Sequence, residues 1–290
     1  SNPYQAPATL NIIPHFEQHF GAYFPHGGMY AIVSSLTKLA IDLGVKFHFN
    51  SYVEEIEIRN NKVTGISCAG QSHSADLIIS NMDVWYTYTR LMKGIKLPER
   101  LQTQERSSSA LIFYWGINAS FAELGLHNIF FTEDYQEEFR QIWKDKSIGS
   151  DPTVYVHISS KSNPQDAPEG SENWFTMINV PSDTGQDWDE LIRVSRKNIL
   201  EKLCRNLGRD ISQLITCESV LDPRGIDSKT FSYQGSLYGS SSNSQFSAFL
   251  RHANFSSGIK DLYFAGGSVH PGGGIPLALL SAKIVDGLIK

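Results

Sequence analysis

The chain has 290 residues, enough for one large domain or two ordinary ones. With 41% hydrophobic and 19% charged residues it has the balance of a globular protein, which excludes disordered, collagenous and coiled-coil classes. The net charge of −5 offers no basic face to phosphates, so we expect no nucleic-acid partner.

The three cysteines, Cys68, Cys204 and Cys217, lie far apart without a CxxC pair and predict neither a disulfide framework nor a zinc site. We expect no bound metal. The N-terminal segment lacks the basic and apolar regions of a secretion signal, and no apolar run is long enough to span a membrane. These features favour a cytoplasmic location.

The first third of the chain predicts a mixed sheet with helices beside it. In chain order, its periodicity indicates a helix over 29–43, a strand over 45–49, a hairpin over 52–68 and a strand over 75–80. The last of these runs shows no alternation, which is typical of a strand covered on both faces.

The middle of the chain changes to antiparallel patterning near Met92. It predicts strands over 110–117, 153–159 and 174–180, and helices over 133–144 and 187–206. The polar segment 232–247, rich in Ser, Gly and Tyr, is expected to form a mobile loop or a cover over a ligand.

The chain closes with a predicted strand over 261–266, a glycine-rich turn and a helix that opens at Ile275-Pro276. Glycines allow close backbone approach, and a helix N-terminus favours an anion or an electron-rich carbonyl. The turn therefore predicts a ligand cradle. The alternative is a tight strand-to-helix connection that needs no ligand.

Two further tracts are candidate binding segments. Val53-Glu54-Glu55-Ile56 lies in the predicted hairpin, and Ser80-Asn81-Met82-Asp83 lies at the end of the predicted apolar strand. Strand ends of α/β sheets are where ligands bind. The alternative is that these are sheet residues and that Asn81 or Asp83 caps a helix.

Together these tracts resemble the amine-oxidase-like flavoproteins, and within them the bacterial phytoene-desaturase type of carotenoid dehydrogenases. The resemblance is carried by 23–29 (YFPHGGM), 53–56, 80–83 and above all 262–281, which contains HPGGGIPLALLSA. It implies an α/β (α+β) fold: the remnant of an FAD-binding Rossmann-like domain plus a mostly antiparallel substrate domain with helices. We assign 1–92 to a substrate-domain helix and part of the FAD domain, 93–250 mainly to the substrate domain, and 251–290 to the closing FAD-binding unit.

The resemblance also implies FAD as the cofactor. In the family the closing motif lies along FAD, which places Gly266, Gly267 and Ser268 near the diphosphate or ribityl and Gly274, Ile275 and Pro276 near the isoalloxazine. Val53 would hold the adenine side through its backbone, and Asn81 would line the same region.

Family members begin with a GxGxxG unit that binds ADP, and this chain contains none. We therefore expect the C-terminal portion of a longer enzyme, whose N-terminal lobe is the partner of this part. Alone, this portion is expected to bind FAD weakly or not at all and to be inactive.

By resemblance the parent enzyme is an FAD-dependent desaturase that oxidises a lipophilic carotenoid by hydride transfer to flavin. The tract GGSVHP at 266–271 resembles the subgroup that acts on hydroxylated carotenoids. Phe113 and Trp115 are candidate walls of a substrate tunnel, or else ordinary sheet core. His270 is a candidate for proton transfer, or else packs in the turn, and the family's reaction is assigned to the flavin alone.

A carotenoid resides in the bilayer, so we expect the full enzyme to contact the inner face of the membrane peripherally. Two alternatives stay open. One is a carotenoid isomerase, ketolase or retinol saturase of the same superfamily, and the other is a non-catalytic carotenoid-binding or partner-binding module.

Overall fold

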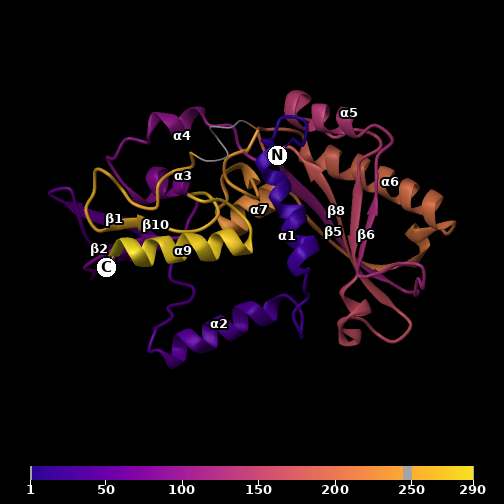
Figure 1. The fold of residues 1–290 in the computed structure, drawn as a ribbon, viewed down its shortest axis with the longest axis horizontal. Coiled ribbons are helices and arrows are strands. Elements are labelled where there is room, and N and C mark those ends of the chain that lie inside the picture. The colour runs from indigo at the N-terminus through magenta and orange to yellow at the C-terminus, as the bar shows by residue number, and fades with distance from the viewer. Residues whose placement is uncertain (1, 244–249, 290) are drawn as a thin grey trace.

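The computed structural model describes residues 2–243 and 250–289, which form a mixed α/β structure (Figure 1). Its α-helices are α1 (Ile12–Phe20), α2 (Tyr30–Asp42), α3 (Val84–Tyr86), α4 (Glu99–Thr103), α5 (Tyr135–Arg140), α6 (Trp188–Leu207), α7 (Pro223–Thr230) and α9 (Ile275–Ile289). Its strands are β1 (Val53–Arg59), β2 (Lys62–Cys68), β3 (Gln71–Ser74), β4 (Ile78–Ser80), β5 (Ser109–Ile117), β6 (His127–Phe130), β7 (Val154–His157), β8 (Glu172–Val180), β9 (Ile215–Leu221) and β10 (Leu262–Phe264).

Two small sheets make up the first half of the fold. Strands β1, β2 and β3 form an antiparallel meander, and its first hairpin turns at Asn60 and Asn61 with φ of 52° and 58°. Strand β4 pairs in parallel with β10 from the other end of the chain, with Ile79 opposite Tyr263. Side chains of both sheets share one core, as the buried Ile56 and Phe264 show.

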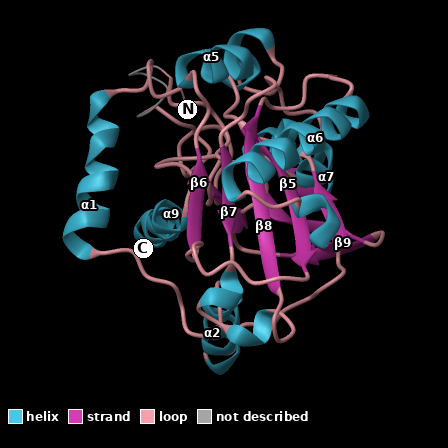
Figure 2. Cartoon of the chain, turned by 90° about the vertical axis from the view of Figure 1, so that its right-hand side faces the viewer, coloured by secondary structure: helices cyan, strands magenta, loops and turns pink. Residues whose placement is uncertain are grey.

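The second half is a five-stranded antiparallel sheet in the order β6-β7-β8-β5-β9 (Figure 2). One face packs against α6 and carries the largest core of the molecule, where Leu111 on β5 and Ile199 on α6 are fully buried. Helix α6 begins at an Asp187 cap and ends at Gly208, whose φ is +64°. The antiparallel sheet that the sequence predicts for the middle of the chain is therefore present.

The opposite face of this sheet is open and aromatic. Tyr114 lies opposite Phe175, and Phe175 lies opposite His157, so all three point to this side. Figure 1 shows α6 on one side of the sheet and α9 on the other, with the N-terminal end of α9 nearer to the sheet. The open face and the closing helix thus border the same region.

Two segments differ from the sequence-based expectation. Residues 45–49 are not a strand, because they are exposed and meet no partner among the described residues. The polar segment near 235–243 is partly buried rather than a free loop: Ser109 Oγ donates to Gly235 O at 2.6 Å and Ser107 N donates to Gly239 O at 2.8 Å. The rest of that predicted loop, 244–247, lies outside the described residues.

Helices α1 and α2 bury none of their residues. Their exposed apolar side chains include Phe16, Val33, Leu36 and Leu39, of which the last three are each about half exposed. In the described part of the chain, no helix has both the length and the apolar character that crossing a bilayer requires.

Candidate functional site

The glycine-rich turn connects β10 to α9 and has an unusual backbone. Gly266, Gly272 and Gly274 have φ of +112°, +137° and +99°, a region that other residues rarely adopt. Pro276 is the second residue of α9, where its missing N–H removes no helical hydrogen bond. The sequence therefore needs its glycines for the shape of the turn.

Most of these glycines are also required by neighbours within the chain. A Cβ on Gly266 would lie 2.6 Å from Asn81 Nδ2, and a Cβ on Gly273 would lie 2.5 Å from Tyr238 Cδ1. Gly274 differs, because a Cβ there would meet no atom within 4 Å. Gly274 is thus the glycine of this turn that faces open space.

A buried polar network fixes the turn to the helix that follows it. Asn254 Nδ2 donates to Phe264 O, His270 O and Ser281 Oγ at 2.8–3.0 Å. Ser281 Oγ in turn accepts the Gly266 N–H at 3.1 Å. The Gly266 amide is therefore already used inside the protein.

Other groups of the turn remain free to bind a ligand. The N–H groups of Ser268, Gly273 and Gly274 have no acceptor among the described residues. The Ser268 hydroxyl is occupied, since it accepts a hydrogen bond from Val84 N at 3.1 Å. Unused amides beside a helix N-terminus suit an anionic or electron-rich ligand, so the donor set fits a flavin nucleotide.

Asn81 and Val53 also lie beside a hollow near this turn. Asn81 Nδ2 donates to Ala265 O at 3.0 Å, which ties the end of β4 to the end of β10. Val53 and Asn81 both line a hollow of ≈ 530 Å³, together with Ile78 and Phe231. The structure thus brings these two sequence-predicted residues together.

Asp83, rather than Asn81, caps the helix that follows: Trp85 N donates to Asp83 Oδ1 at 2.9 Å. The Asp83 carboxylate also lies 3.6 Å from Arg106 Nη1, and both side chains are buried. Burial raises the pKa of Asp83, and the Arg106 guanidinium acts against this rise. Arg106 also lies over the Tyr233 ring at 4.7 Å, so its side chain connects Asp83 to the turn at 233–235.

Phe113 needs correction as a candidate tunnel wall, because it is fully buried in the core between the sheet and α6. Trp115 is also almost fully buried in that core, although it is among the residues that line a groove on the open side of the sheet. Successive residues of a strand point to opposite faces, so Tyr114 is the β5 aromatic that faces the open side. The sequence predicted the strand but not which of its faces is covered.

His270 is exposed, and its ring has no hydrogen-bond partner among the described residues. A general base needs an orienting contact, and none is present at this ring. We therefore give His270 no part in the proposed site.

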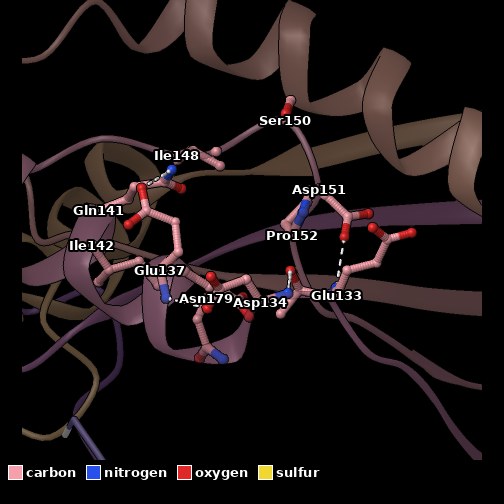
Figure 3. Close-up of a pocket in the computed structure, with 13 residues that line it drawn as sticks. Glu133, Asp134, Glu137, Gln141, Ile142, Ile148, Ser150, Asp151, Pro152 and Asn179 are labelled. Carbon is pink, nitrogen blue, oxygen red and sulfur yellow. Dashed lines mark hydrogen bonds between the residues drawn. The ribbon is translucent and has the colours of Figure 1, made fainter.

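A second hollow lies between α5 and the loop before β7, and it is strongly acidic (Figure 3). Its carboxylates have structural partners: Asp134 accepts the Glu137 N–H that begins α5, and Asp151 pairs with Lys202 at 2.8 Å. No group of His, Cys, Asp and Glu suited to hold a metal ion occurs in the described residues.

Comparison with known proteins defines the class to which this fold and turn belong. The chain is a member of the flavin-containing amine oxidoreductase family, whose model matches residues 3–285. Solved structures agree on the fold: an oxidoreductase from Methanosarcina mazei covers 95% of the chain with a TM-score of 0.63 at 17% identity. A putrescine oxidase variant covers 90% with a TM-score of 0.54 at 16% identity.

Among proteins of known name, a 1-hydroxycarotenoid 3,4-desaturase from Flavobacterium sp. (strain P99-3) is 54% identical over 289 residues. A 4,4'-diapolycopene oxygenase from Methylomonas is 32% identical over 292 residues, and a phytoene desaturase from Fusarium fujikuroi is 30% identical over 308 residues. These alignments cover 98–100% of the chain but only 54–59% of each relative. The chain thus spans little more than half the length of these relatives.

The sequence-based reading recognised the turn but missed the residues that hold it, namely Tyr238, Arg251, Asn254 and Ser281. Ser281 lies inside the closing motif, so its polar side chain directly after the apolar run 275–280 was an available signal. The other three come from segments without periodicity, and their positions follow from tertiary contacts.

Proposed function

We propose that this chain is part of an FAD-dependent desaturase that acts on a hydroxylated carotenoid. The observation that carries the proposal is the 54% identity with a 1-hydroxycarotenoid 3,4-desaturase across the chain. The match to an oxygenase is weaker, at 32% identity, and favours oxygenation less.

In this proposal FAD lies along the two sites described above. Val53 and Asn81 line the hollow for the adenine side, while Gly266, Gly267 and Ser268 follow the central part of the cofactor. Gly274, Ile275 and Pro276, at the N-terminal end of α9, approach the ring. FAD held by these residues would supply the acceptor for the hydride that a desaturation removes from the substrate. The partial positive charge at the start of α9 favours the negative charge that this transfer brings.

The open face of the large sheet is the proposed binding surface for the polyene. A groove of ≈ 700 Å³ is lined by Tyr114, His157 and Phe175, and it includes the Tyr114–Phe175 edge-to-face pair at 5.5 Å. Aromatic rings bury large apolar areas against an apolar chain, and the core behind the sheet keeps them in place.

The proposal also covers the domains of the whole protein, its missing part and its contact with the membrane. We propose that 1–92 contains a substrate-domain helix and part of the FAD-binding domain, that 93–250 is mainly the substrate domain, and that 251–290 is the C-terminal FAD-binding unit. The exposed apolar residues of α2 and α9, such as Leu36 and Leu279, would contact the part of the longer enzyme that the relatives' extra length represents. Peripheral contact with the inner face of the cytoplasmic membrane would bring the enzyme to its lipophilic substrate.

The test uses the complete natural protein, examined for flavin absorbance and then given hydroxylated and non-hydroxylated carotenoids. We expect bound FAD and a product with one more double bond, formed faster from the hydroxylated substrate. A colourless protein that takes up no FAD would contradict the proposal, as would a product that is only isomerised or that contains added oxygen.

A substitution on the open face of the large sheet tests the proposed binding surface for the polyene. Tyr114→Ala is expected to raise KM about tenfold, because it removes an aromatic contact with the polyene. Tyr135→Ala is a matched control, since Tyr135 and Tyr114 are exposed to similar extents, 37% and 41%, but Tyr135 lies on α5. An equal effect of the two substitutions would contradict the placement of the substrate.

A further inference from the structure

Arg251 lies beside the glycine turn and is held entirely by uncharged acceptors. Its Nη1 donates to Tyr238 O at 2.6 Å and to Gly267 O at 3.4 Å. Its Nη2 donates to Ser240 O at 3.0 Å and to Ser242 Oγ at 3.4 Å. The guanidinium thus joins the polar segment near 238–242 to the turn.

No carboxylate of the described residues forms an ion pair with Arg251, although the side chain is half-buried. Burial lowers the pKa of Arg251, and no neighbouring charge offsets that effect. Arg106, which is buried near this region, does have a carboxylate partner in Asp83. A charge that is withdrawn from water normally has a partner of opposite sign, and the half-buried Arg251 has none among the described residues.

The unused donor of Arg251 points to where that partner would lie. Its Nε has no acceptor among the described residues, whereas both of its terminal nitrogens do. Nε lies 3.0 Å from the position that a Cβ on Gly272 would occupy. Gly272 has φ of +137° and no side chain to block this approach. The free N–H groups of Ser268 and Gly273 belong to the same turn.

We propose that Arg251 is a cofactor-binding residue whose positive charge is completed by an anionic group of the flavin nucleotide at the turn 266–274. The anion is either the diphosphate or the negatively charged reduced ring, and the chemistry of recognition is the same for both. This inference rests on the proposed function, because it assumes that the turn binds FAD.

The experiment uses the complete natural protein and the variants Arg251→Gln and Arg251→Lys. Three quantities are measured: the dissociation constant of FAD, that of riboflavin, which has no phosphate, and the midpoint potential of the bound flavin. Arg193→Gln is the control, because Arg193 is an exposed arginine of α6 that pairs with Glu190.

If the diphosphate is the partner, Arg251→Gln weakens FAD binding about tenfold or more and leaves riboflavin binding unchanged, as loss of a charge-assisted hydrogen bond requires. If the reduced ring is the partner, oxidised FAD binds as before and the midpoint potential becomes more negative. In either case Arg251→Lys restores most of the effect, because it keeps the charge, and Arg193→Gln changes none of the three quantities.

Two results overturn the inference while leaving the proposed function intact. One is a wild-type protein that binds FAD together with an Arg251→Gln variant that alters neither affinity nor potential. The other is an equal loss of FAD and riboflavin affinity without rescue by lysine, which would show a purely structural clamp. A wild-type protein that binds no FAD would instead refute the proposed function itself.

Discussion

At the scale of single residues, Gly266 is the position of the turn that tolerates change least. Its φ is +112°, and Asn81 Nδ2 occupies the space that a side chain would need. Gly266→Ala is therefore expected to lower the free energy of unfolding by about 1–3 kcal/mol through backbone strain, and to weaken flavin binding in the complete protein. Urea unfolding and flavin titration measure the two effects.

Gly258→Ala is the matched control for this substitution. A Cβ at Gly258 meets nothing within 4 Å, and its φ is not in the positive region. We expect a change in stability of no more than a few tenths of a kcal/mol, in line with an exposed surface position. Equal destabilisation by both substitutions would show that the Asn81 contact has no special weight.

Glu172 gives a prediction on pH dependence. It is almost fully buried, pairs with Lys161 at 2.6 Å and accepts hydrogen bonds from Phe121 N and Trp174 Nε1. Burial alone would raise the pKa of Glu172, but these hydrogen bonds and the Lys161 charge hold it below the usual value. A carboxyl whose folded pKa is lowered stabilises the fold above the unfolded pKa of about 4.3, and this contribution is lost as the pH falls through the folded value.

We expect Glu172→Gln to reduce the free energy of unfolding at pH 7 by about 1–3 kcal/mol, because the charge-assisted hydrogen bonds are weakened. The loss of stability between about pH 5 and pH 3 should be smaller in the variant than in the wild type. Glu201→Gln, which removes an exposed ion pair with Lys197, should lower the free energy of unfolding by less than about 1 kcal/mol. If the free energy of unfolding falls equally steeply with pH below pH 5 in the wild type and in Glu172→Gln, the stabilising role of the Glu172 carboxylate is refuted.

At the scale of elements, one hydroxyl joins α9 to β10. Ser281 Oγ accepts from both Gly266 N and Asn254 Nδ2, and both Asn254 and Ser281 are buried. Ser281→Ala leaves the buried Gly266 N–H without its acceptor, while Asn254 Nδ2 keeps its two carbonyl acceptors, so we expect the free energy of unfolding to fall by about 1–3 kcal/mol in thermal or urea unfolding. Ser257→Ala, on an exposed loop, should be neutral, and a neutral Ser281→Ala would mean that water replaces the hydroxyl.

Helices and strands whose apolar residues recur at a regular spacing could be predicted from the sequence. Elements that depend on contacts with distant parts of the chain could not. The helices near 29–43 and 187–206 and the hairpin over 52–68 follow from apolar spacing and from Asn60-Asn61. Residues 45–49 alternate like a strand, yet no neighbouring strand among the described residues pairs with them. Alternation is necessary for a half-buried strand but does not supply its partner.

The same limit applies to the site. The motif around 266–276 could be found because backbone conformation restricts which residues fit there. The roles of Arg251 and Asn254 could not, since they depend on a segment that returns to the turn through tertiary contacts. Phe113 and Tyr114 illustrate the problem at its smallest: adjacent aromatic residues face opposite sides, and only the packing of α6 decides which is buried.

At the scale of the whole molecule, the apolar faces of α2 and α9 dominate the expected solution behaviour. Val33, Leu36 and Leu39 on α2 are about half exposed, and such contiguous apolar surface promotes association. We expect residues 1–290 on their own to self-associate with increasing concentration in sedimentation velocity. The double substitution Leu36→Lys with Leu39→Lys should shift the equilibrium toward monomer.

Ser35→Lys controls for the added charge, because Ser35 is exposed on the same helix and its replacement removes no apolar side chain. It should leave the association nearly unchanged. If the chain sediments as a monomer at all concentrations, the α2 surface does not drive association.

The parallel pair of β4 and β10 also sets the order in which the molecule is completed during synthesis. Asn81, after β4, contacts Ala265, after β10, across 184 positions of the chain, and the entire five-stranded sheet is encoded between them. On the ribosome, the sheet has all of its strands before the partner of β4 has been made, so the sheet can fold first. The turn at 266–274 takes its shape only when the segment with β10 pairs with β4, which is synthesised well before it.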